Sequence, residues 1–416
     1  MPESAPTTTT ARRDRVLPLD GLRTLAIALV VLYHLHVPGF GSGFVGVNVF
    51  FVLSGYLITT LLLREHARTG RIRLGRFWVR RILRLYPTLL AVVVAGVALW
   101  GVIGSYQGSS MSAGGAALVA ITYTGNLARA FFDQAQGVFA PMWSLSMEEQ
   151  FYLVWPPLLL LGLALVAGRR HGRTLLVGAL AVLVVASSVA AGLLHEVPAS
   201  GSTPAIYFSP VLNVGPLLLG CLLSVVLDDP RGRAVFAGRG GTVATWVGLA
   251  GVLGSLVAIR SGWQQTPLTF GLALPAVAVA SALLIGGLAG RPSLVARALS
   301  LGPVAWAGRA LSYPIYLWHV LMIALISPVL SGPLGIVAVL VATVAVSALS
   351  HRFVEQPALR LKDRLEPGAR GSRADAAAVG RDSGASTRSP ALAGADALAD
   401  LDAARDEARR AALSRA

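Results

Sequence analysis

Residues 19–38 read LDGLRTLAIALVVLYHLHVP, an apolar run that contains one arginine and two histidines. A helix needs about 20 apolar residues to cross a hydrocarbon layer of about 30 Å. Similar runs recur along the chain, and candidate spans lie at residues 22–38, 44–63, 87–103, 143–167, 174–194, 209–227, 242–259, 268–289, 311–330 and 334–350. The sequence therefore predicts an all-α, polytopic membrane helix bundle with about ten transmembrane helices.

The composition supports this class and argues against others. Of 416 residues, 55% are hydrophobic and 13% are charged, whereas about 25% are charged in soluble proteins. The net charge of +15 would suit a nucleic acid, but no soluble basic domain or RNA-binding motif accompanies it. We expect the lipid bilayer as a partner and no nucleic acid. The single Cys221 and the spacing of the histidines predict no disulfide framework and no metal site.

The distribution of positive charge predicts the orientation. Whether the weaker stretch at residues 111–128 crosses the membrane decides the side of every later loop. If it does not cross, 33 of the 35 Arg and Lys residues share one face with both termini, and only Arg129 and Arg260 lie on the other. The positive-inside rule then predicts a protein of the inner (plasma) membrane with both termini in the cytoplasm. Under the same rule, residues 111–142 are predicted to form a re-entrant or extracytoplasmic segment.

Residues 71–86 predict an interfacial amphipathic helix that ends at Pro87. Four of its arginines share one side of the helical wheel, opposite aromatic and aliphatic side chains. One interpretation is attraction to anionic lipid head groups. The other is that Arg81 and Arg84, one turn apart, bind a phosphate-bearing ligand from the cytosol. The residues alone favour neither.

The composition changes near the C-terminus. Residues 363–416 are rich in Ala, Gly, Ser, Arg and Asp and lose apolar periodicity, which predicts a disordered cytoplasmic tail. The chain then divides into a cytoplasmic N-terminal tail at 1–17, a transmembrane domain at 18–362 and the C-terminal tail at 363–416.

Ionisable side chains inside spans cost about 2.5–3.5 kcal/mol each on insertion scales, so those that are present are candidates for function. Arg23 and His34 are eleven residues apart, which is ~1100° of helical rotation and ~16.5 Å of rise. They share one face of the first span at different depths. His34 should lie in the outer part of the membrane, where a neutral imidazole can accept a proton near pH 7. A histidine that only packs in the core is the alternative.

Three later segments add polar candidates. In the second span, Asn48 and its small neighbours suit close helix packing, which is the stronger interpretation there. Residues 143–155 read WSLSMEEQFYLVW, and the carboxylate of Glu148 has the alternative role of complementing a helix dipole. Residues 312–319 read SYPIYLWH and end on His319, for which a hydrogen bond to a neighbouring helix is the alternative.

Taken together, six segments resemble the membrane acyltransferase-3 family, which includes bacterial O-acyltransferases of surface glycans, peptidoglycan and macrolides. They are LDGLR at 19–23 with ten residues before His34, FFVLSGY at 50–56, RILRLYP at 81–87, WSLSME at 143–148, YPIYLWH at 313–319 and RFVEQP at 352–357. The resemblance implies transfer of an acyl group, most simply acetyl, from cytoplasmic acyl-CoA to a hydroxyl of a sugar or glycosylated acceptor at or beyond the outer face.

On this resemblance we expect acyl-CoA as the donor substrate and no permanently bound cofactor. Arg81 and Arg84 would bind the CoA phosphates, the pantetheine arm would pass Arg23, and Tyr56 is a further donor-binding candidate. His34 would act as general base, or as an acylated nucleophile in a second variant. Glu148 would orient the imidazole or bind the acceptor. Candidates for contacts with the acceptor or the oxyanion are Asn48, Trp143, Ser144, Tyr316 and His319.

A proton-coupled transporter or flippase of an envelope precursor is the rival class, because such proteins also use intramembrane His and Glu side chains. Comparison of the two halves gives no convincing inverted repeat. Many family members that modify cell-wall polymers continue into an extracytoplasmic hydrolase-like domain. The tail at 363–416 is short and is expected on the cytoplasmic side. The sequence therefore does not favour a polymer as the acceptor over a lipid-linked sugar, a glycolipid or a secreted natural product.

Overall fold

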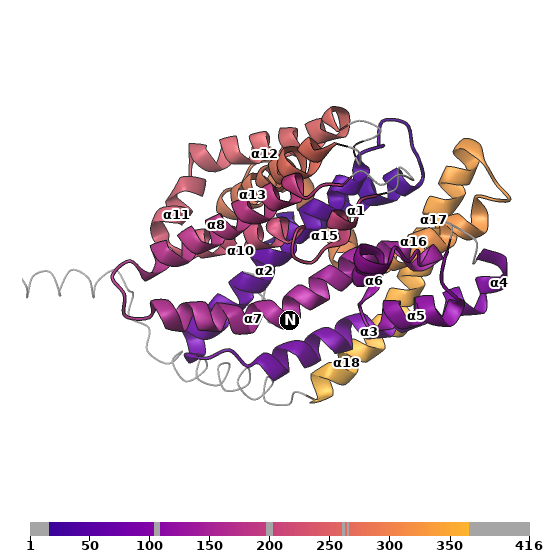
Figure 1. Cartoon of the computed structure of the whole chain (residues 1–416), viewed down its shortest axis with the longest axis horizontal. Coiled ribbons are helices and arrows are strands. Elements are labelled where there is room, and N and C mark those ends of the chain that lie inside the picture. The colour runs from indigo at the N-terminus through magenta and orange to yellow at the C-terminus, as the bar shows by residue number, and fades with distance from the viewer. Residues whose placement is uncertain (1–15, 104–108, 197–202, 260–262, 264–265, 366–416) are drawn as a thin grey trace, which may run out of the picture. The chain divides into compact units, whose positions relative to one another are not determined.

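The computed structural model describes residues 16–103, 109–196, 203–259, 263 and 266–365, with side chains described up to residue 360. The two predicted tails, at 1–17 and 363–416, lie almost entirely outside these residues. The part of the chain up to Leu359 forms one unit. Every regular element in the described ranges is helical, and Figure 1 shows these helices as a bundle. The predicted all-α class is confirmed.

A helix occurs at each of the ten predicted spans. They are α1 (Leu17–His34), α2 (Gly46–Thr69), α3 (Leu74–Ala98), α7 (Trp143–Val166), α8 (Gly172–Leu193), α10 (Gly215–Asp228), α12 (Arg239–Ala258), α13 (Leu274–Gly290), α16 (Ser312–Ile326) and α17 (Gly332–Ser350). Within the described ranges, eight helical segments are long and apolar enough to cross a membrane. The pair α15 (Gly302–Ala310) and α16, bent by 70°, makes a ninth if it is one span, and α10 is a shorter apolar helix. The chain is a multi-pass membrane protein.

The remaining described elements are short or lie at the ends of spans. They are η1 (Gly43–Val45), α4 (Trp100–Ile103), α5 (Ala113–Ile121), α6 (Gly125–Phe132), η2 (Gly137–Met142), α9 (Ala205–Phe208), α11 (Pro230–Phe236), η4 (Thr269–Ala273), α14 (Leu294–Leu299), η5 (His351–Glu355) and α18 (Gln356–Leu365). Of these, η4 and η5 are π-helical turns joined to α13 and to α17.

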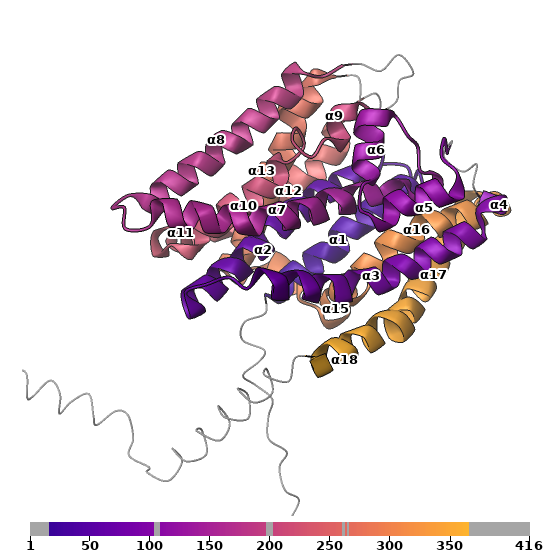
Figure 2. The same ribbon diagram turned by 60° about the horizontal axis from the view of Figure 1, so that its bottom comes forward.

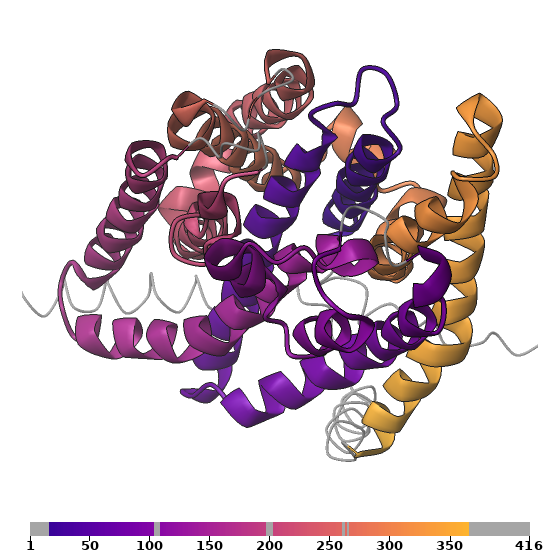
Figure 3. The same cartoon turned by 45° about the vertical axis from the view of Figure 1, so that its right-hand side comes forward.

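Helices α1 and α2 run through the middle of the unit, between the α10, α12 and α13 group and the α3, α7 and α16 group (Figure 2). The orange α17 lies at the edge of the bundle against α16 (Figure 3). Large apolar side chains stay exposed on outer helices, for example Leu161 of α7 and Val182 and Val185 of α8. Such surfaces suit contact with lipid, since hydrocarbon does not penalise apolar exposure.

Close approach of α2 and α10 fixes the central packing. A Cβ atom added at Gly55 would lie 2.0 Å from the carbonyl oxygen of Leu217, and one at Gly220 would lie 2.1 Å from that of Val52. Only glycine permits such backbone contact, and small residues drive helix association in membranes for this reason. This packing determines which face of α2 is turned toward the site.

The arginine-rich segment does not form a separate interfacial helix. It is the first part of α3, which runs without a break from Leu74 to Ala98 and contains Pro87. Proline removes one backbone hydrogen bond, but membrane helices tolerate it where neighbouring groups pair with the freed backbone. The carbonyl that Pro87 leaves without its usual donor is that of Leu83. One turn before Thr88 and Leu89, the hydroxyl of Tyr313 donates to the neighbouring carbonyl of Leu85 at 2.8 Å and ties this part of α3 to α16. Arg81 and Arg84 are therefore rigidly joined to the span that follows.

Residues 111–142 fold back instead of forming one long helix. Helix α5 has nine residues, α6 has eight and η2 has six, and at about 1.5 Å per residue each falls far short of about 30 Å. Between α5 and α6 the chain turns at Tyr123, which has a φ of 52°. The segment therefore has the form expected of a re-entrant or extracytoplasmic element.

Candidate active site

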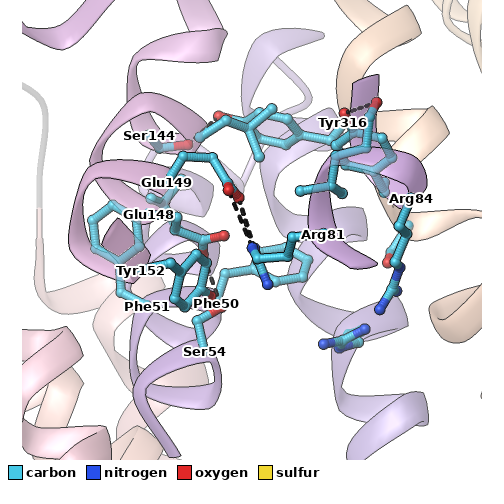
Figure 4. A pocket seen from close by; sticks show the side chains of 16 residues that line it. Phe50, Phe51, Ser54, Arg81, Arg84, Ser144, Glu148, Glu149, Tyr152 and Tyr316 are labelled. Carbon is cyan, nitrogen blue, oxygen red and sulfur yellow. Dashed lines mark hydrogen bonds and ion pairs between the residues drawn. The ribbon is translucent and has the colours of Figure 1, made fainter. Parts of the chain in front are cut away.

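Two adjacent pockets lie among α1, α2, α3, α7 and α16. The first, here the arginine pocket, is lined mainly by polar side chains, including Arg23, Ser54, Arg81, Arg84, Ser144, Glu148, Glu149, Tyr152, Tyr313 and Tyr316 (Figure 4). The second, here the histidine pocket, is lined by Tyr33, His34, His36, Phe44, Arg129, Trp143, Tyr207, Phe208, Trp263 and Tyr316, among others. Val47 and Tyr316 line both pockets and so separate them.

Arg81 is already paired inside the arginine pocket. Its Nε lies 3.1 Å from both carboxylate oxygens of Glu149, and a terminal nitrogen lies 2.7 Å from one of them. The guanidinium also sits 3.6 Å from the centre of the Tyr152 ring (Figure 4). A bidentate pair on an aromatic face holds the guanidinium in one orientation and largely neutralises its charge.

Arg23 and Arg84 differ from Arg81. No hydrogen bond or ion pair to either guanidinium occurs within the described part of the chain. Both side chains line the pocket, and Arg84 is exposed to it. These two arginines therefore carry the positive charge that an anionic ligand would meet.

Glu148 faces the arginine pocket and not the histidine pocket. One of its carboxylate oxygens accepts a hydrogen bond from the Ser54 hydroxyl at 2.9 Å. Figure 4 shows this carboxyl group on the same side as Arg81. Among the described contacts none joins Glu148 to His34, so the structure does not bring together the pair that the sequence suggested.

His34 ends α1 and meets a second histidine from α16. Its Nδ1 lies 2.8 Å from the carbonyl oxygen of Val30. Because a carbonyl only accepts, this Nδ1 carries a proton, and in the neutral ring Nε2 is the acceptor. His319 has the same arrangement, with Nδ1 2.7 Å from the carbonyl oxygen of Tyr316. The two rings meet edge to face with centroids 4.9 Å apart. The site thus contains two imidazoles whose Nδ1 atoms are donors, so that in each neutral ring Nε2 is left as the acceptor.

Tyr316 is fixed between the two pockets. Its hydroxyl donates to the carbonyl oxygen of Pro141, and the Ser144 hydroxyl lies 2.6 Å from it. Since the phenol proton is used on Pro141, Ser144 is the donor in the second contact. A path from Arg84 to His34, which the sequence-based mechanism requires, is closed by Tyr316 and Val47 in this structure. Opening it requires the Tyr316 side chain to move.

Comparison of the sequence with known families identifies the chain. Residues 17–352 match the sequence model of a family described as an acyltransferase domain, Acyl_transf_3. The chain belongs to this acyltransferase family. The predicted resemblance is confirmed, and the matched range contains all the candidate residues named above.

Curated relatives in the acyltransferase family include peptidoglycan O-acetyltransferase OatA of Listeria monocytogenes, which is 33% identical over 362 residues. The alignment covers 84% of this chain and 57% of that protein. O-acetyltransferase OatA of Staphylococcus aureus is 31% identical over 358 residues, with 82% of this chain and 57% of the relative covered. The chain therefore spans a little over half of the length of these relatives. No solved structure matches it significantly.

Two predicted residues lie away from the arginine and histidine pockets. Tyr56 lines a different pocket with Arg64 and Arg233, since it is two residues, or about 200° of rotation, from Ser54. Asn48 donates to the carbonyl of Leu274 on α13 at 3.4 Å and lines neither of the two pockets. The helix-packing interpretation of Asn48 fits this contact.

Residues that the sequence did not single out complete the two pockets. Glu149 and Tyr152 hold Arg81, and Arg129 lines the histidine pocket. One signal was available: Ser144, Glu148 and Tyr152 recur every four residues and so share a helix face. The charge count had set Arg129 apart as one of two cations expected on the outer face, but it could not connect Arg129 with this pocket, because the other lining residues come from distant segments. Among the described residues no cluster of three or more His, Cys, Asp or Glu side chains could hold a metal ion.

Replacing Glu149 with glutamine is expected to lower the thermal unfolding midpoint in detergent by several degrees. The side chains of Arg81 and Glu149 are only 24% and 17% exposed, and leaving one partner of such a contact unpaired costs about 1–3 kcal/mol. The matched control is Arg173→Gln, which breaks ion pairs with Asp228 and Asp229 where Arg173 is 43% exposed. Exposed pairs contribute about 0–1 kcal/mol, so equal shifts for the two variants would contradict the prediction.

Proposed function

We propose that this chain is an integral membrane O-acyltransferase. It moves an acetyl group from acetyl-CoA on the cytoplasmic side to a hydroxyl of a glycan or glycosylated acceptor on the outer side. The observation that carries the proposal is the adjacency of two chemically different pockets, one with the unpaired cations Arg23 and Arg84 and one with His34. Family membership and the O-acetyltransferase names of the relatives support the same reaction.

The donor is assigned to the arginine pocket. Guanidinium groups bind phosphate oxygens with charge-assisted hydrogen bonds, and Arg23 and Arg84 are available for the CoA phosphates. Arg81 is held by Glu149, which neutralises most of its charge, so Arg81 forms a fixed part of the pocket wall. The pantetheine arm then passes Tyr316, whose side chain moves to admit it. The positive-inside count supports a cytoplasmic opening for this pocket.

Acyl transfer takes place at the boundary between the two pockets. The acceptor hydroxyl gives its proton to Nε2 of His34 as its oxygen attacks the thioester carbonyl. The tetrahedral oxyanion collapses, the carbon–sulfur bond breaks, and the CoA sulfur takes the proton from the imidazolium. The hydroxyls of Ser144 and Tyr316 lie at this boundary, and both donate within the protein; the movement of Tyr316 that admits the donor frees the Ser144 proton, which makes Ser144 a candidate oxyanion donor. His319 packs on His34 and positions its ring. Transient acylation of His34 remains the second variant.

Purified protein in proteoliposomes tests the reaction. With labelled acetyl-CoA on one side and a peptidoglycan-derived oligosaccharide on the other, we expect a labelled, base-labile ester that requires both substrates. Vesicles loaded with the oligosaccharide alone serve as the control. Movement of the oligosaccharide across the membrane without acetylation would overturn the proposal and support a transporter or flippase instead.

A further inference from the structure

We propose that the histidine pocket selects an acceptor that carries a negative charge, namely a sugar ring bearing a carboxylate or phosphate group, and that Arg129 pairs with this group. The inference rests on the proposed function and names the class of acceptor. It follows from three features of the pocket: aromatic walls, a lone arginine, and a rigid support for that arginine.

Aromatic side chains make up much of the pocket wall. Phe44 stacks on Trp263 with ring centroids 4.1 Å apart. The Trp143 ring lies 4.7 Å from that of Tyr207 and 5.1 Å from that of Phe208. Such rings offer large, rigid and amphipathic surfaces, and the C–H faces of a sugar ring can stack on them while its hydroxyls reach polar atoms.

Arg129 is the one permanently charged side chain among the described residues that line this pocket. Its guanidinium carbon lies 4.5 Å from the centre of the Phe208 ring, which orients the guanidinium plane. No aspartate or glutamate belongs to the described lining. The contrast with Arg81 is direct, because Glu149 neutralises that arginine within the protein.

Asp133, four residues along the chain, does not fill this role. It is exposed, and no ion pair to Arg129 occurs in the described part of the chain. Burial lowers the pKa of the Arg129 guanidinium, and the charge of Asp133 opposes that shift. Arginine nevertheless stays protonated in proteins. A partly buried cation without a bonded anion is costly, and an anionic ligand would remove that cost.

The helix that carries Arg129 is anchored to both neighbouring walls. In α6 the side-chain amide of Asn126 donates to Gln150 of α7 at 3.2 Å and to the Phe208 carbonyl of α9 at 3.3 Å. Gln150 in turn donates to Asn126 at 2.9 Å and to the Tyr123 carbonyl at 2.8 Å. The guanidinium is therefore held in place before the acceptor arrives, which reduces the entropy lost on binding.

Equilibrium binding to the reconstituted protein, without acetyl-CoA, tests the proposal. Two matched pairs of probes are followed by tryptophan fluorescence: the methyl glycoside of N-acetylmuramic acid against its methyl ester, and N-acetylglucosamine 6-phosphate against N-acetylglucosamine. We expect wild type to bind the anionic member of at least one pair about 10–100-fold more tightly, the range of one charge-assisted hydrogen bond. The pair that responds identifies carboxylate or phosphate as the recognised group.

Arg129→Gln should abolish that preference, whereas Arg169→Gln, an exposed loop substitution on the opposite side by the charge count, should leave it intact. Equal affinities within both pairs in wild type, or a preference that survives in Arg129→Gln, would overturn the proposal. The comparison of anionic and neutral probes with the wild-type protein tests the anion preference even if Arg129→Gln does not fold. If the protein prefers the anionic probe but does not acetylate it after acetyl-CoA is added, only the proposed function is overturned. If the protein acetylates the probes without preferring the anionic one, only the role of Arg129 is overturned.

Discussion

His34→Gln is expected to lower the rate of acetyl transfer by roughly 10²–10⁴-fold, the usual contribution of a general base. Glutamine has a similar size and can keep a hydrogen bond to the Val30 carbonyl, which His34 contacts at 2.8 Å, but it cannot accept the proton of the acceptor. The measurement is the initial rate of labelled ester formation in proteoliposomes at saturating acetyl-CoA.

The control for this variant is His171→Gln, an exposed histidine just before α8, which should transfer acetyl groups at the wild-type rate. Thermal unfolding in detergent verifies that His34→Gln is folded. A folded His34→Gln protein with near-normal turnover would remove His34 from the mechanism, and with it both the general-base and the acyl-histidine variants.

Charge reversal at Arg84 should raise the KM for acetyl-CoA by about 10–100-fold, because at least one charge-assisted contact with a CoA phosphate, worth about 1.5–3 kcal/mol, becomes repulsive. Turnover at saturating donor should change much less, since Arg84 lies on the arginine-pocket side of Tyr316. The measurement is a titration of acetyl-CoA at a fixed, saturating acceptor concentration.

Arg80→Glu is the matched comparison, one turn earlier on α3 and outside the lining of the arginine pocket. If α3 uses its arginines only to hold lipid head groups, both reversals should leave the donor KM unchanged. A selective effect at Arg84 would separate donor binding from lipid anchoring, which the sequence left as equal interpretations.

Much of the fold was predictable from local composition. Each of the ten predicted spans contains a helix, and the segment at 111–142 folds into pieces too short to cross. The reason is that a helix in hydrocarbon satisfies its own backbone hydrogen bonds, so apolar length alone identifies it. The break predicted at Pro87 was wrong, because α3 continues through it and membrane helices tolerate a proline in their interior.

The site was only partly predictable. The motifs identified Arg23, Arg84 and His34 as candidates. In the structure the two arginines line one pocket and His34 lines the adjoining one. Hydropathy could not reveal that Glu149 forms an ion pair with Arg81, or that Tyr316 lies between the two pockets. It also could not reveal that Asn48 and Tyr56 lie outside both pockets. Each of these depends on the rotation of a helix about its own axis.

The sequence by itself determined the class of protein and where its apolar helices lie, because hydrophobicity is a property of each segment taken alone. Its motifs indicated the family, because they too are local stretches of sequence. Only the tertiary structure decided which charges are neutralised and which remain available. The contact of His34 with His319, and the placement of Arg129 among aromatic rings, join segments far apart in the chain. Such contacts are set by how helices pack, as where Gly55 and Gly220 let α2 and α10 touch, and packing is a relation between segments that no single stretch encodes.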